Sequence, residues 1–254
     1  MALKKRQQIN APAFRATDRQ REDLNRRLHT YETFDIDPVT SKKAGGAAGG
    51  TTGDENVALF QDTAFEWHVL GTQTILAPSL AATGLDINQD QTDNDGIELS
   101  QGILANSRHA YTVGTDGPFF LRVKFSIVDV SGTDDCAIGF RKAEAYQANI
   151  DDYDEMAALN VISGDVKIET ILNGAATTTT DTTDNWADGA THTLKVKVSK
   201  TGVVTYELDG VAPTTVAAFT FDTSEVVVPF MYFLNASDVA GAVVVQEWEC
   251  GLGQ

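Results

Sequence analysis

Apolar and polar residues alternate with a period of two along much of the chain. The clearest run is 119–127, where apolar residues at the odd positions alternate with Arg, Lys and Ser at later even positions. Runs 192–199 and 203–209 alternate in the same way. Such alternation indicates strands with one buried face. Helical periodicity is nearly absent from 57–254, where one helical turn is expected at 154–159. The pattern therefore predicts an all-β body.

The last two of these runs predict a β-hairpin with a defined register. If Val198 faces Val204, the apolar residues of both strands share one face, and Lys195 lies opposite Glu207 on the other face. This register leaves the three-residue loop 200–202, which ends in glycine, and such loops commonly have a left-handed residue at that position. A two-residue loop would place the two apolar sets on opposite faces.

Further apolar runs predict the remaining strands, because clusters of Asp, Gly, Ser, Thr and Asn separate them as turns require. These strands are expected at 57–61, 65–69, 73–76, 97–99, 109–113, 136–140, 165–172, 219–221, 226–234 and 242–249. The Thr-rich segment 177–183 is expected to be an edge or a loop. Many short strands of this kind predict an antiparallel β-sandwich of jelly-roll type.

The hairpin also carries a resemblance to a known fold family. Segment 186–210 contains Trp-x-Asp-Gly, then His-x-Leu-x-Val, a glycine turn and Tyr-x-Leu-Asp-Gly. This order resembles the central hairpin of concanavalin A-like, laminin-G-like sandwiches. The resemblance implies that 57–254 adopts a fold found in lectins, glucanases, adhesion modules and domains on virus particles. It does not specify an activity.

Charge divides the chain into unequal parts. Residues 1–43 contain ten Lys and Arg against six Asp and Glu, a net of +4, whereas the remainder carries −21. Residues 44–53 are all Gly, Ala or Thr, a composition typical of flexible linkers. The predicted organisation is a basic N-terminal arm (1–43), a Gly-rich linker (44–56) and a β-sandwich (57–254). A basic arm on an acidic body suggests two surfaces with different partners.

The extended arm is expected to carry one short helix. Thr17 and Gln20 form a capping box, and Leu24, Leu28 and Tyr31 then follow on one helical face. Because so short a helix is marginal alone, it needs a surface to lie on. The residues expected to bind a partner are Arg15, Arg19, Arg21, Leu24, Arg26, Arg27, Leu28 and Tyr31. The alternative is a disordered basic tail.

No motif predicts catalysis. The four His residues lack metal-ligand spacing, and neither a phosphate loop nor a nucleophile elbow is present. In the β-glucanase relatives, the catalytic acids come from one strand with the pattern Glu-x-Asp-x-x-Glu. The nearest match, 247–249, lacks the central Asp and the third acid. Because glycoside hydrolysis needs two placed carboxylates, a non-enzyme is expected. Cys136 and Cys250 are expected to be reduced.

One segment is a candidate for a metal ion. The possible Ca²⁺ ligands in 86–96 are Asp86, Asn88, Asp90, Asp93 and Asp95. Calcium prefers such oxygen ligands, but Gln91 and Ile97 stand where an EF-hand loop has Gly and Glu. A solvated acidic turn without a cofactor is therefore expected, with Ca²⁺ as the alternative.

Composition also limits the expected partners and location. The N-terminal residues lack the apolar core of a secretory signal, and no apolar run is long enough to cross a bilayer. Synthesis in a host cytoplasm and no membrane partner are expected. A body with a net charge of −21 is not expected to bind nucleic acid.

A basic arm joined to a lectin-like sandwich without catalytic acids resembles the capsid decoration (cement) proteins of tailed bacteriophages. The resemblance implies a non-enzymatic structural protein on the capsid surface of a virion. The arm would anchor it to the major capsid protein lattice, where it would form a homo-oligomer. The alternative is a carbohydrate-binding, lectin-like module of a phage spike, fibre or adhesin, whose partner is a glycan.

Overall fold

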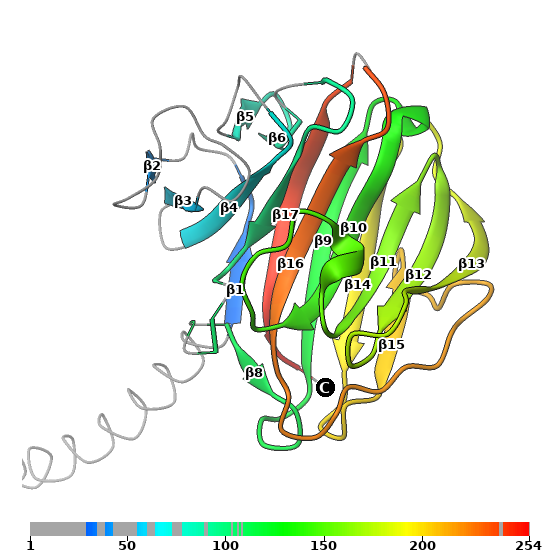
Figure 1. The fold of residues 1–254 in the computed structure, drawn as a ribbon. Helices are drawn as coiled ribbons and strands as arrows, with labels where there is room; N and C mark the ends of the chain where they lie inside the picture. Colours follow the sequence, from blue (N-terminus) through cyan, green and yellow to red (C-terminus); the bar gives the residue numbers. More distant parts are fainter. Residues whose placement is uncertain are drawn as a thin grey trace, which may run out of the picture.

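Two antiparallel β-sheets form the molecule and lie face to face (Figure 1). The computed structural model describes residues 29–34, 39–42, 55–59, 64–72, 78–88, 91–102, 104–105, 107, 109–238 and 241–253. Within these ranges the regular structure is almost entirely strand, as the period-two pattern predicts. The two-sheet sandwich confirms the predicted fold class. No helix among the described residues is long and apolar enough to span a bilayer.

The first sheet, sheet A, contains the predicted hairpin. Its described strands follow the order β15-β14-β9-β17-β6-β5, and β1 also pairs with β17. Their bounds are β1 His29–Glu32, β5 Ser79–Ala81, β6 Gly84–Asp86, β9 Phe119–Ile127, β14 Thr191–Val198, β15 Val204–Leu208 and β17 Val243–Leu252.

The second sheet, sheet B, has the described order β13-β12-β11-β10-β16-β7-β4-β3-β2, with β8 beside β16. Its strands are β2 Val39–Lys42, β3 Glu55–Leu59, β4 Ala64–Leu70, β7 Gly96–Ser100, β8 Tyr111–Thr112, β10 Thr133–Lys142, β11 Met156–Ile162, β12 Asp165–Ile171, β13 Thr178–Asn185 and β16 Val226–Asn235. Two short 3-10 helices, η1 Val130–Gly132 and η2 Ile150–Asp152, flank β10 and β11.

The core lies between the two sheets. The odd-numbered residues of β9, such as Leu121 and Phe125, are buried there among side chains from both sheets. Trp248 of β17 packs edge-on against Phe65 of β4, with 5.2 Å between ring centroids. Burying one such side chain stabilises the fold by about 1.5–3 kcal/mol. The polar residues at the even-numbered positions of β9 consequently lie on the outer face of sheet A.

The structure confirms the predicted hairpin register. Val198 pairs with Val204, and Lys195 pairs with Glu207. The last loop residue, Gly202, has φ +86°, and an added Cβ would lie 2.3 Å from the Phe221 carbonyl oxygen. The pattern therefore fixes both the facing residues and the turn.

Not every short segment agrees with the sequence prediction. The helical turn expected at 154–159 is wrong, because Met156–Ile162 forms β11 in the middle of sheet B. Apolar residues on both faces of this strand are buried, so the period-two signal is lost. The strand expected at 219–221 is instead an isolated bridge between Thr220 and Val203, whereas the Thr-rich segment forms the edge strand β13, as expected. The strand expected at 73–76 lies outside the described residues.

The end of the predicted arm belongs to the sandwich. Tyr31 was expected on a helix, but His29–Glu32 forms β1 and pairs with β17. Phe34 is buried in the core, and Thr30 Oγ1 lies 2.8 Å from His109 Nε2. An isolated helix this short is only marginally stable. As a strand, the same segment pairs its backbone N–H and C=O groups with an existing sheet edge. The remaining arm residues, including the capping box, lie outside the described ranges, and the expected linker ends inside β3.

Candidate functional site

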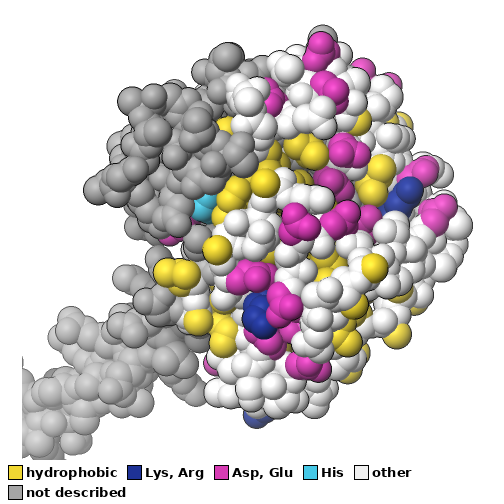
Figure 2. Space-filling model, in the orientation of Figure 1, with side chains coloured by type: hydrophobic (Ala, Val, Ile, Leu, Met, Phe, Trp, Pro, Cys, Tyr) yellow, Lys and Arg dark blue, Asp and Glu magenta, His cyan; other side chains and the backbone are white. Residues whose placement is uncertain are grey.

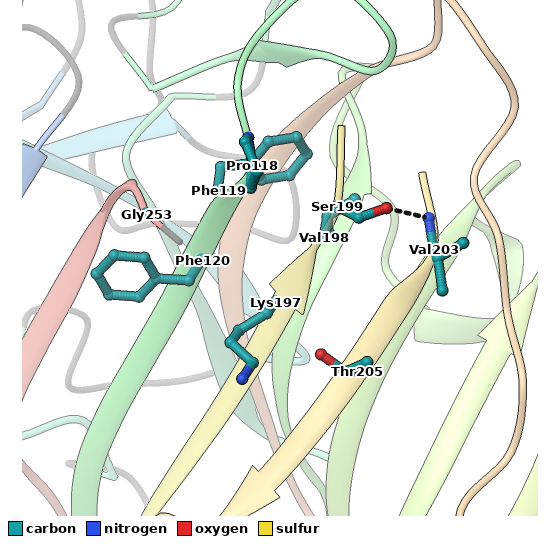
Figure 3. A pocket seen from close by; sticks show the side chains of 9 residues that line it. All are labelled: Pro118, Phe119, Phe120, Lys197, Val198, Ser199, Val203, Thr205 and Gly253. Atoms are coloured by element: carbon teal, nitrogen blue, oxygen red, sulfur yellow. Dashed lines mark hydrogen bonds between the residues drawn. The ribbon is translucent and has the colours of Figure 1, made fainter. Parts of the chain in front are cut away.

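A cavity of about 280 Å³ opens at one end of sheet A (Figure 3). Four chain segments meet there: the start of β9, the end of β14, the start of β15 and the residue after β17. The lining residues are Pro118, Phe119, Phe120, Lys197, Val198, Ser199, Val203, Thr205 and Gly253. Cavities of roughly 300–1,000 Å³ typically hold small ligands, so this one suits a compact ligand or one unit of a longer chain.

Backbone and side-chain hydrogen bonds fix the walls of the cavity. Ser199 Oγ accepts from the Val203 amide at 3.0 Å and holds the hairpin turn closed. The Gly253 amide donates to the Pro118 carbonyl oxygen at 2.8 Å and joins two other wall segments. Phe119 points into the core, where it stacks on Tyr111 at 4.5 Å between centroids. The cavity is therefore built on rigid strand ends.

The polar and aromatic groups of the cavity come from neighbouring strands. Phe120 points outward from β9, and the Lys195 ammonium lies 4.5 Å from the centre of its ring. The Lys197 ammonium forms an ion pair with Glu207, one strand away. Thr205 adds an exposed hydroxyl. The cavity thus offers an aromatic ring, a hydroxyl and an ammonium donor, and the acceptor Glu207 lies beside its wall.

The charge of the cavity differs from that of the rest of the molecule. The chain has 36 Asp and Glu against 19 Lys and Arg. On the face visible in Figure 2, carboxylates are spread over the surface and Lys and Arg are few. None of the residues lining the cavity carries a carboxylate, and one of them, Lys197, carries an ammonium. Because Glu207 beside the cavity offsets the Lys197 charge, the site is close to neutral whereas the surrounding surface is acidic.

The acidic pair that sequence analysis compared with glucanases lies on the outer face of sheet A. Arg122 donates to Glu247 at 2.7 Å and to Glu249 at 3.1 Å, and Lys124 also contacts Glu247. Burial alone would raise the pKa of Glu249, but hydrogen bonds from Arg122 and His29 outweigh it and lower that pKa. A glycosidase general acid needs a raised pKa, so Glu249 does not fit that role.

A buried ionic network lies on the opposite side of the molecule, on the outer face of sheet B. Arg141 Nη2 donates to Glu98 Oε1 at 2.6 Å, and both side chains are fully buried. Burial lowers the pKa of Arg141, but the nearby Glu98 and Tyr153 outweigh that and raise it. The Tyr153 hydroxyl donates to Glu98 Oε2. The segment carrying η2 crosses in front of sheet B (Figure 1), and Tyr146 from it stacks on His68 at 4.6 Å. This network is covered and holds the segment to the sheet.

A second acidic cluster links four strands of sheet B. The Asn160 amide donates to Asp135 at 2.6 Å and to Glu169 at 2.8 Å, and Thr179 donates to Glu169. Burial, together with the nearby charges of Glu169, Asp134 and Asp151, raises the pKa of Asp135 to about 7, although the hydrogen bond from Asn160 lowers it. Burial also raises the pKa of Glu169.

This cluster predicts that the free energy of unfolding falls as the pH rises from about 4 to about 7. Because the pKa of Asp135 is higher in the folded chain than in the unfolded chain, the folded state binds the proton more tightly. That stabilisation is complete below about pH 4, is lost progressively up to about pH 7, and changes little above it. We expect Asp135→Asn to raise the free energy of unfolding at pH 8 by about 1–3 kcal/mol. Urea unfolding of both proteins at pH 5 and pH 8 measures the effect; an equal difference at both pH values would contradict it.

The calcium candidates do not form one set of ligands in the described chain. Asn88 is buried and donates to the Gly241 carbonyl oxygen at 2.8 Å, and buried Asp95 accepts from the Thr72 amide at 2.6 Å. Asp86 accepts from the Asn88 amide, and the Asp93 amide donates to Asp238. Asp90 lies outside the described residues. Among the residues that are described, no group of three or more His, Cys, Asp or Glu is arranged to hold a metal ion.

The predicted partner-binding residues remain largely untested. Tyr31 is 51% exposed on β1. The other seven, from Arg15 to Leu28, lie outside the described ranges. Sequence analysis missed the cavity, because its residues come from four separate segments. The one usable signal was Phe120, an apolar residue at an outward position of an alternating strand.

Comparisons with known proteins place the fold in a class. No protein-family model and no curated protein matches the sequence. The potassium-bound form of the Emp46p carbohydrate recognition domain matches with a TM-score of 0.50 and 9% identity, over 74% of this chain and 89% of that chain. The alginate lyase from Corynebacterium sp. gives 0.49 and 14%, over 90% and 94%. The CBM2 module of the evolved Dit of Lactobacillus casei BL23 phage J-1 gives 0.49 and 10%, over 89% and 96%.

At these identities the likeness shows the fold alone. The chain has the lectin-like, concanavalin A-like jelly-roll fold, as the hairpin motif predicted. A fold by itself does not decide between binding and catalysis, so function must be argued from the site.

Proposed function

We propose that the protein is a non-catalytic saccharide-binding module whose site is the cavity at the end of sheet A. Sugars present apolar C–H faces, which pack on aromatic rings, and hydroxyl groups, which need both donors and acceptors. Phe120 supplies the ring, Thr205 supplies a hydroxyl, and the Lys197–Glu207 pair supplies a donor beside an acceptor. The lectin-like fold is consistent with this role.

One observation carries the proposal: an outward aromatic ring forms part of a cavity whose walls are rigid strand ends. Phe120 occupies a position where the alternation of β9 otherwise places Arg122, Lys124 and Ser126. Phe120 is partly buried but does not belong to the core cluster, so a binding role accounts for it better. The nearest acidic pair is held by Arg122, which favours binding over glycoside hydrolysis.

A glycan array followed by calorimetry on the full chain tests the proposal. We expect at least one class of saccharide to bind, and Phe120→Ala to lower its affinity at least tenfold, because the stacking surface is removed. Val211→Ala, at an exposed apolar position that does not line the cavity, is the matched control and should bind as the wild type does. Chelator should leave binding unchanged. Failure of the wild type to bind any glycan would contradict the proposal.

A second candidate is a capsid decoration protein anchored to the major capsid protein. The observation that favours it is the charge division: residues 1–28 carry eight Lys and Arg against three Asp and Glu, whereas 29–254 carries −22. Such a segment would bind an acidic neighbour in a salt-sensitive manner. Co-sedimentation with assembled capsids tests it. The full chain should bind and the 29–254 variant should not; equal occupancy by both would contradict it.

A further inference from the structure

The outer face of sheet A aligns its side chains in straight rows across the strands. His29 pairs with Gly251, Gly251 with Phe120, Phe120 with Lys197, and Lys197 with Thr205, across β1, β17, β9, β14 and β15. These five positions form the transverse row. Neighbouring strands lie about 4.8 Å apart, so the row spans roughly 19 Å. The cavity occupies its β9–β15 end.

The other end of the transverse row carries further aromatic rings. Gly251 has no side chain, so the rings of His29 and Phe120 approach each other above it, with 6.4 Å between centroids. Tyr31 follows two residues along β1, on the same outward face and 51% exposed. Aromatic rings thus extend from the cavity over β17 to β1, where Tyr31 faces Glu249 of β17. This stretch is longer than a single sugar unit needs.

The charges along this face are neutralised in pairs. Arg122 is bound by Glu247 and Glu249, His29 also contacts Glu249, and Lys197 is bound by Glu207. Each pair still presents a donor and an acceptor to a hydroxyl group. Of the outward cations on β9 and β14, Lys195 is the one without an ion pair among the described residues, and its ammonium lies over Phe120. A balanced face of this kind suits an uncharged polyhydroxyl chain better than a polyanion.

We propose that the ligand is a linear, neutral oligosaccharide of at least three units that crosses the strands of sheet A from the cavity to β1. Phe120 binds the first unit, and His29 and Tyr31 form a distal subsite for the later units. This inference rests on the proposed saccharide-binding function. It gives β1, the strand that sequence analysis assigned to the arm, a direct part in the site.

The test is a length series of the neutral saccharide that the array identifies, from one unit to six, titrated into the full chain. Affinity should rise about tenfold or more between one and four units and then level off. Tyr31→Ala should remove most of that rise while leaving affinity for the single unit unchanged. Phe120→Ala should weaken every member of the series. Tyr31→Phe, which keeps the ring, should behave as the wild type.

The outcomes separate the two proposals. If saccharides bind but affinity does not change with length, or if Tyr31→Ala weakens binding of all lengths equally, the distal subsite is contradicted. Saccharide binding in the cavity would still be supported. If no saccharide binds, the proposed function itself fails. Tighter binding of a sulfated or uronate chain of equal length would overturn the neutral assignment. Thermal unfolding should show that Tyr31→Ala is folded, because this side chain points away from the core.

Discussion

Replacing Arg141 by Ala is expected to lower the free energy of unfolding by about 3–5 kcal/mol. The substitution leaves the Glu98 carboxylate buried beneath the η2 segment without its cation. It also removes the guanidinium that lies 4.5 Å from the centre of the Tyr153 ring. A buried charge that loses its partner has neither water nor a counter-ion to stabilise it, so the loss exceeds what the ion pair itself contributes.

The adjacent residue provides a matched control for this prediction. Lys142 also forms ion pairs, with Asp154 and Glu225, but its side chain is 31% exposed. Lys142→Ala should cost under about 1 kcal/mol, because exposed pairs contribute little. Urea unfolding of the three proteins at pH 7 measures both effects. Equal losses for the two variants would show that the Arg141–Glu98 pair is not isolated from water.

Removing residues 1–43 is expected to destabilise the sandwich by at least about 3 kcal/mol, whereas removing 1–28 should change its stability little. The longer deletion removes β1, β2 and Phe34. The centroid of the Phe34 ring lies 5.7 Å from that of the Phe65 ring. Loss of one buried Phe side chain alone costs about 3–5 kcal/mol. The edge of β17 that pairs with β1 would also lose its backbone partner.

Thermal unfolding of the full chain, 29–254 and 44–254 measures this difference. Because the 29–254 variant keeps β1, β2 and Phe34, it is the proper one for testing a partner. A 44–254 variant that unfolds at the same temperature as the full chain would show that β1 and Phe34 contribute nothing to the sandwich.

The sequence predicts a strand well where one face of the strand is buried and the other is exposed to solvent. The hairpin of β14 and β15 meets this condition, so alternation and a loop ending in Gly202 determine its register. Strand β11 does not, because Ala157 and Ala158 are both buried on opposite faces of sheet B. Strand β1 was missed for another reason: its pairing partner, β17, lies more than 200 residues away.

The candidate site was less predictable than the fold. Its cavity forms where Pro118, Lys197, Thr205 and Gly253 converge, and no local pattern joins these positions. The transverse row likewise depends on strand order, since β17 stands between β1 and β9. The ion pairs show the same limit. Lys195 faces Glu207 and was expected to pair with it, but the ammonium of Lys197 forms the ion pair instead. Register determines which backbone positions face each other across two strands, but it does not determine which ion pair a long side chain forms.

The position of Gly253 has a practical consequence for anyone who works with this protein. This residue follows β17 and forms part of the cavity wall, where its Cβ position would touch the Phe120 ring. A chain extended by an affinity tag past Gly253 therefore starts beside the mouth of the cavity, where the tag would compete with a ligand. Binding measurements are better made with the tag at the other end or removed by protease.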